Sequence, residues 1–124
     1  MERLVREITT YMPRIDFSPE GKLVMEGRAI PEDATKFFAP LIEFADNLNT
    51  NEVIFDINLE YFNTAASKKL LELMKHLDAN NNITSVRINW HFEEGDEDSV
   101  DTAEIYEDSL VRVDFRYFEY AEVA

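Results

Sequence analysis

Two adjacent polar residues, Asn63 and Thr64, stand where a strand-like segment gives way to a helical one. Residues 56–62 alternate in the way that is typical of a strand, and residues 65–69 open a helical pattern. The first N–H groups of a helix have no partner within it, and the helix dipole is positive there. A hydroxyl at this point can therefore cap the helix, bind an anion or accept a phosphate. The residues alone leave these roles open for Thr64.

Phosphorylation of Thr64 would fit this position physically. A phosphate adds about −1.5 to −2 charge at pH 7. The helix dipole and the free N–H groups would stabilise that charge, so the helix need not melt. Lys68 follows one turn later, where its ammonium group can contact the phosphate. The modification would then change the surface and block docking rather than unfold the chain.

Other chemical constellations are weak in this sequence. There is no cysteine, and no serine stands in a Gly-x-Ser-x-Gly elbow. His76 and His91 fall on different expected elements and lack metal-site spacing. The acidic residues 93–98 lack the ligand spacing of an EF-hand, and we expect a solvated loop. We therefore expect no enzyme, no metal and no cofactor; a metal-dependent catalyst using His91 and the acidic loop is the least favoured alternative.

Length and composition are typical of one domain, residues 1–124, with a substantial core. The chain is 45% hydrophobic and includes nine Phe, five Tyr and one Trp. No apolar run is long enough to span a membrane, and the charged N-terminus lacks the apolar core of a signal peptide. We expect a cytoplasmic protein.

The charge balance limits the partners. Twelve basic residues against 26 acidic ones give a net charge of −14. Such a chain is repelled by nucleic acid phosphates and by anionic membrane surfaces, so we expect neither as a partner. A basic or mixed protein surface is compatible with it.

The elements that must position Thr64 follow from hydrophobic spacing. A strand over residues 4–12, a turn over 17–21 and a strand over 22–26 indicate an N-terminal hairpin. Residues 34–48 show a helical apolar stripe, with Pro31 expected in the first turn. Further strands are expected over residues 53–60, 86–92 and 111–117, and further helices over 64–77 and 100–110.

The resulting order is ββαβαβαβ, which predicts an α/β fold with a mixed sheet and right-handed crossovers. The strands at 53–60 and 86–92 each alternate between apolar and polar residues. Fully buried parallel strands usually read as continuous apolar runs. The alternation therefore predicts helices on one face of the sheet only.

Five short segments, residues 13–17, 27–32, 59–64, 89–91 and 96–98, together resemble a known family in order and spacing. The chain resembles the STAS-type anti-sigma-factor antagonists and, more closely, the SiaC family of biofilm-regulation phosphoproteins. The resemblance covers nearly the full length and implies a single STAS-like domain.

The resemblance also implies a non-enzymatic phospho-switch. A serine/threonine protein kinase would phosphorylate the threonine of the Asn-Thr motif, here Thr64, and a PP2C-type phosphatase would reverse this. The unphosphorylated form would bind and activate a diguanylate cyclase, which raises cyclic di-GMP and promotes biofilm formation. STAS antagonists more widely capture an anti-sigma factor instead.

The sequence departs from the family pattern in three places. Ala65 and Ala66 stand where serines are common after the Asn-Thr pair. Ala29 and Asp33 replace the usual Ser and Asn before the first helix, and residues 99–103 are atypical. The alanines leave Thr64 as the clear acceptor in the turn, with Ser67 as a secondary candidate. Recognition by the usual family kinase does not follow from the resemblance.

Our leading hypothesis is a phospho-switch adaptor whose docking surface surrounds Thr64. The expected docking residues are Tyr61, Phe62, Asn63, Thr64, Ser67 and Lys68. Tyr61 and Phe62 are equally compatible with core positions. The competing hypothesis is a constitutive binding module in which Thr64 serves only as a helix cap.

Overall fold

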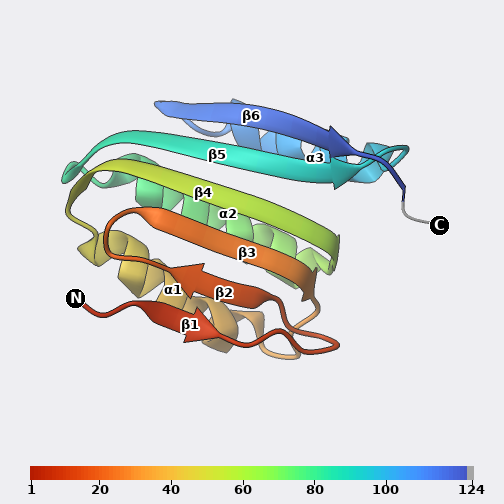
Figure 1. The fold of residues 1–124 in the computed structure, drawn as a ribbon, viewed down its shortest axis with the longest axis horizontal. Helices are drawn as coiled ribbons and strands as arrows, with labels where there is room; N and C mark the ends of the chain where they lie inside the picture. The colour runs from red at the N-terminus through yellow and green to blue at the C-terminus, as the bar shows by residue number, and fades with distance from the viewer. Residues whose placement is uncertain (123–124) are drawn as a thin grey trace.

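Six strands form one sheet whose spatial order, β1 to β6, follows their order in the chain. The computed structural model describes residues 1–122. Three helices lie together behind the sheet in Figure 1, and within the described residues the opposite face carries none. The α/β class with a mixed sheet and helices on one face, predicted from the sequence, is confirmed.

The sheet combines an antiparallel N-terminal part with a parallel remainder. The strands are β1 (Leu4–Arg6), β2 (Arg14–Phe17), β3 (Lys22–Ala29), β4 (Thr50–Phe62), β5 (Ile83–Glu93) and β6 (Val113–Tyr120). β1, β2 and β3 pair antiparallel, whereas β3 to β6 pair parallel. The parallel strands are joined by helical crossovers, as the alternating order predicts.

The N-terminal segment differs from the prediction of one strand over residues 4–12. β1 ends at Arg6, and a loop closed by hydrogen bonds between Thr9 and Met12 precedes Pro13. Proline has no N–H to donate to a strand ladder, and it marks the break between β1 and β2. The loop turns the chain back, so that β2 pairs with both β1 and β3.

Each helix begins after an Asx residue that caps it. The helices are α1 (Ala34–Asn47), α2 (Thr64–Ala79) and α3 (Glu97–Asp108). Asp33, Asn63 and Asp96 each accept a hydrogen bond from the backbone N–H three residues later. Because Asp33 caps α1, Pro31 precedes the helix instead of lying in its first turn. None of these helices is both long and apolar enough to cross a membrane.

The core lies between the sheet and the three helices. Val53, Phe55 and Ile57 of β4 are fully buried on the helix-covered face, as their alternation predicts. Asp56 and Asn58, on the other face of the same strand, are half-exposed. The core side of α2 is supplied by Ala66, Leu70, Leu73, Met74 and Leu77. This packing fixes α2 against the sheet, with its N-terminus at the carboxyl end of β4.

Candidate functional site at the N-terminus of helix α2

Asn63 fixes the turn between β4 and α2 through four hydrogen bonds. Its side-chain oxygen accepts from the Ala66 N–H at 2.8 Å, and its carbonyl accepts from the Ser67 N–H at 2.9 Å. Its own N–H donates to the Ala29 carbonyl at 3.1 Å, and its side-chain amide donates to the Pro31 carbonyl at 3.4 Å. The turn is therefore anchored to the connection between β3 and α1.

Thr64 is the exposed first residue of α2, and it does not cap the helix. The prediction that Thr64 is the cap is wrong, because Asn63 occupies that position. Asn63 also satisfies the N–H groups of Ala66 and Ser67. Among the described residues, the N–H groups of Thr64 and Ala65 are left without such a partner. These two donors, at the positive end of the helix, can receive an anion.

Ser67 lies on the inner side of the same turn and contacts Tyr106 of α3. The two hydroxyl oxygens are 2.7 Å apart, and the Tyr106 hydroxyl also lies within 2.8 Å of the Ser67 carbonyl oxygen, to which it donates. Burial raises the pKa of Tyr106 to about 12, against a smaller lowering by the bond with Ser67. Ser67 is half-buried, so its hydroxyl is less accessible than that of Thr64.

Lys68 is exposed and makes no ion pair with the residues that the structure describes. Its neighbour Lys69 instead pairs with Glu72 at 3.0 Å. Among the described residues, Lys68 therefore keeps an ammonium group without an ion pair, four residues after Thr64.

A β-bulge near the end of β4 decides where Tyr61 and Phe62 point. Leu59 pairs with Gly27, but Tyr61 pairs with Arg28, so Glu60 is an extra residue on β4. Beyond the bulge, Tyr61 is 53% exposed. Phe62 packs edge-on against Trp90, with ring centroids 6.0 Å apart. Of the two residues, Tyr61 is thus available to a partner, and Phe62 belongs with the core.

A buried network behind the turn was missed from the sequence. The Trp90 indole N–H donates to the Ser99 hydroxyl at 2.9 Å, and the Ser99 N–H donates to Asp96 at 3.1 Å. The Trp90 ring also contacts Tyr106 edge-on at 5.7 Å. Trp90, Ser99 and Tyr106 come from β5 and α3, so only the tertiary structure brings them behind the Thr64 turn.

The two histidines contact aspartates that lie outside the acidic residues 93–98. The His76 ring lies 2.7 Å from Asp46, and the His91 ring lies 3.2 Å from Asp56 and stacks on Phe118. Asp96, within the acidic stretch, caps α3. Across residues 1–122, no group of three or more His, Asp or Glu side chains is arranged to hold a metal ion.

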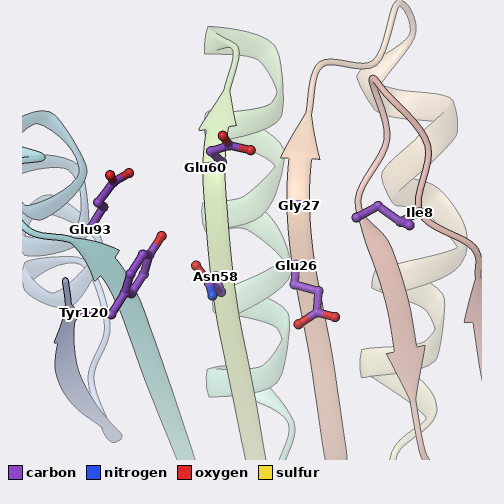
Figure 2. A pocket seen from close by; sticks show the side chains of 7 residues that line it. All are labelled: Ile8, Glu26, Gly27, Asn58, Glu60, Glu93 and Tyr120. Atoms are coloured by element: carbon purple, nitrogen blue, oxygen red, sulfur yellow. The ribbon is translucent and has the colours of Figure 1, made fainter. Parts of the chain in front are cut away.

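A depression of about 400 Å³ lies on the helix-free face, at the carboxyl ends of the strands. Its lining includes Glu26, Asn58, Glu60, Glu93 and Tyr120. Figure 2 shows these side chains spread over neighbouring strands instead of converging on one point. With three carboxylates and no cationic side chain in the lining, this depression repels anions, in contrast to the N-terminus of α2.

The fold and the anchored Asn-Thr turn define a small α/β protein with an accessible threonine at a helix N-terminus. The chain belongs to the SiaC family of regulatory phosphoproteins, whose family model matches residues 6–120. A comparison with curated proteins gives no match.

Three solved structures share the fold. SiaC of Pseudomonas aeruginosa, in the crystal structure of the diguanylate cyclase SiaD in complex with its activator SiaC, is similar with a TM-score of 0.81 and 22% identity; the match covers 94% of this chain and 99% of that one. A second SiaC structure from the same organism has a TM-score of 0.75 and 22% identity, and the match covers 98% of this chain and 100% of that one. The apo-SiaC crystal structure, from the same organism, has a TM-score of 0.74 and 24% identity, and the match covers 95% of this chain and 99% of that one.

Proposed function

We propose that this chain is a non-enzymatic signalling adaptor that is switched by reversible phosphorylation of Thr64. The observation that carries the proposal is the placement of Thr64, exposed at the start of α2 beside two N–H groups that have no partner within residues 1–122. Membership of a regulatory phosphoprotein family supports a phosphorylated side chain in this chain.

The turn can accept a phosphate without losing its shape. Asn63 holds the turn through its own hydrogen bonds, and none of these uses the Thr64 hydroxyl. A phosphate on Thr64 would meet the N–H groups of Thr64 and Ala65 and the ammonium group of Lys68. The exposed surface beside Tyr61 would then gain charge and bulk while α2 stays folded. The modification acts by obstructing a partner.

The partner that we propose for the unphosphorylated form is a diguanylate cyclase, in the control of cyclic di-GMP and biofilm formation. The support is the similarity to a SiaC structure that was solved with a diguanylate cyclase. A serine/threonine protein kinase and a PP2C-type phosphatase would set the state of Thr64. The docking surface would include Tyr61, Asn63, Thr64 and Lys68, with Phe62 and Ser67 supporting it from the core side.

Two alternatives have different partners or no switch. An anti-sigma-factor antagonist would use the same turn to capture an anti-sigma factor. A constitutive binding module would bind its partner whatever the state of Thr64. Ser67 is the secondary acceptor, but its phosphorylation would require breaking the contact with Tyr106.

The experiment is phosphorylation of the chain by the proposed serine/threonine protein kinase, read by intact mass. We expect one added phosphate on the wild type and on Ser67→Ala, removed by the PP2C-type phosphatase. Thr64→Val keeps the shape of the side chain and lacks the hydroxyl, so it should stay unmodified. Equal phosphorylation of the wild type and Thr64→Val would exclude Thr64 as the acceptor.

Partner binding tests the switch separately. Wild type and Thr64→Val should bind and activate the cyclase alike, whereas Thr64→Glu and the phosphorylated chain should bind at least tenfold more weakly, about 1.4 kcal/mol. Equal binding by all four forms would favour the constitutive module. Binding to an anti-sigma factor in place of the cyclase would favour the antagonist.

A further inference from the structure

The free edge of the sheet at β6 is long. β6 runs over eight residues and pairs with β5 alone among residues 1–122. It forms the upper margin of the sheet in Figure 1. The opposite edge strand, β1, has only three residues, and short edges are poor templates for pairing. β6 is therefore the edge with the capacity to pair with a further strand.

The helix-free face of β6 carries opposite charges at alternate positions. The side chains of Asp114 and Arg116 are 52% and 49% exposed, and they form an ion pair with each other at 3.0 Å. Arg87 of β5 also approaches Asp114, at 3.4 Å. On the helix-covered face, Phe115 is buried and Tyr117 is half-buried. The first half of β6 thus presents a charged side and an apolar side, and Phe118, 43% exposed, follows the two charges on the helix-free face.

We propose that residues 113–117 of β6 pair antiparallel with the same residues of a second copy of this chain, around a twofold axis at Phe115. In this register, Asp114 of each copy lies opposite Arg116 of the other, so that two opposite-charge pairs form across the interface. On the helix-covered face, Phe115 lies opposite its own copy, and Val113 lies opposite Tyr117. The two sheets would join into one continuous sheet.

The charges select this register over its neighbours. An axis at Asp114 would place that carboxylate opposite its own copy, and an axis at Arg116 would do the same for the guanidinium group. Like charges directly opposite each other destabilise a strand pair. Only an axis at Phe115, which lies between Asp114 and Arg116, places each of these charges opposite the other sign in the second copy.

The interface is small, and the association should be weak. A single strand pair buries less than the roughly 1,600 Å² of a standard interface. Each copy also carries a net charge of −14, so two copies repel each other at long range. We therefore expect a dimer that forms with rising protein concentration. Because β5 separates β6 from β4, this pairing does not depend on the proposed role of Thr64.

Sedimentation equilibrium of the full chain, from about 10 μM to about 1 mM at physiological salt, tests the proposal. The wild type should approach twice the monomer mass as concentration rises. Asp114→Arg alone and Arg116→Asp alone should each stay monomeric, because they put like charges opposite each other. The double variant Asp114→Arg/Arg116→Asp should associate again.

A mixture of the two single variants gives the sharpest result. Equal amounts of Asp114→Arg and Arg116→Asp should form a heterodimer, because each strand then carries one sign of charge. Arg28→Asp, on β3, makes the same charge change as Arg116→Asp and should leave association unchanged. Far-UV circular dichroism checks that every variant is folded. A wild type that stays monomeric to about 1 mM, or a mixture that fails to associate, would overturn the proposal.

Discussion

The Tyr106 hydroxyl lies 2.7 Å from the hydroxyl of Ser67 and 2.8 Å from its carbonyl oxygen. The contact joins residues 39 positions apart and ties α3 to the first turn of α2. Because Tyr106 is 3% exposed, this is a polar link inside the core. It holds the turn that carries Thr64 from behind.

Stability at alkaline pH should depend on Tyr106. Burial raises the pKa of Tyr106 to about 12, whereas a tyrosine in the unfolded chain titrates near pH 10. The stabilisation that comes from keeping the Tyr106 hydroxyl protonated in the folded chain is therefore complete below about pH 10 and is lost as the pH rises through about 12. Urea denaturation at about pH 9 and about pH 11 should show a larger loss of stability for the wild type than for Tyr106→Phe.

Tyr11→Phe, at an exposed tyrosine, is the control for this comparison. It should lose stability between the two pH values as the wild type does. If Tyr106→Phe also follows the wild type, then the Tyr106 hydroxyl is not buried as the structure shows.

Substitutions at Asn63 and at Thr64 should differ in their effect on stability, because Asn63 caps α2 and Thr64 does not. Asn63→Ala removes the bonds to the Ala66 N–H and the Pro31 carbonyl, and should lower the free energy of unfolding by about 1 kcal/mol or more. Thr64→Ala should change it by less than about 0.5 kcal/mol, since the Thr64 side chain is exposed. Urea denaturation at neutral pH measures both. The reverse ranking would restore Thr64 as the cap.

The bulge at Glu60 predicts opposite outcomes for two adjacent aromatic residues. Phe62→Ala should destabilise the fold by roughly 2–3 kcal/mol, because the ring packs against Trp90. Tyr61→Ala should cost less than about 0.5 kcal/mol, since this side chain is mostly exposed. Thermal unfolding of both variants checks the prediction. A larger loss for Tyr61→Ala than for Phe62→Ala would mean that the alternation of β4 continues without the bulge.

Arg112 should stabilise the C-terminal end of α2. Its guanidinium group donates to five backbone carbonyls, those of Leu77, Asp78, Asn80, Ile83 and Thr84. Arg112→Ala should cost roughly 1–2 kcal/mol in urea denaturation, and Arg112→Lys should recover little, because an ammonium group cannot reproduce the planar fork. Arg28→Ala, at an exposed arginine of β3, should be nearly neutral. A neutral Arg112→Ala would show that solvent competes fully for these carbonyls.

The sequence predicted the parts of the fold that depend on local periodicity. The apolar stripe of residues 34–48 and the alternation at Val53, Phe55 and Ile57 correspond to α1 and β4. The same reasoning missed the division of the N-terminal strand, because the Thr9–Met12 turn carries no Gly or Pro within it. It could not foresee the bulge either, since Glu60 fits the alternation of β4 as well as its neighbours do.

The turn that carries the proposed site was predicted in position but not in its details. The strand-to-helix change located the Asn63–Thr64 turn correctly. Both residues can cap a helix, and only the backbone geometry shows which one precedes the first helical residue. Nothing in the sequence indicated that the Ser67 hydroxyl has a partner, because its contact with Tyr106 requires α3 to pack beside α2. Such long-range contacts leave no periodic signal in the sequence.

Trp90 is the one tryptophan of the chain, and it is 1% exposed. Its indole touches Phe62 from the strand that leads into the turn and Tyr106 from α3. The chain therefore contains an intrinsic fluorophore that contacts Phe62, just before the Thr64 turn, and Tyr106, which contacts Ser67 just after it. Its emission wavelength and quenching can report the proposed phosphorylation and partner docking in real time, without an attached dye.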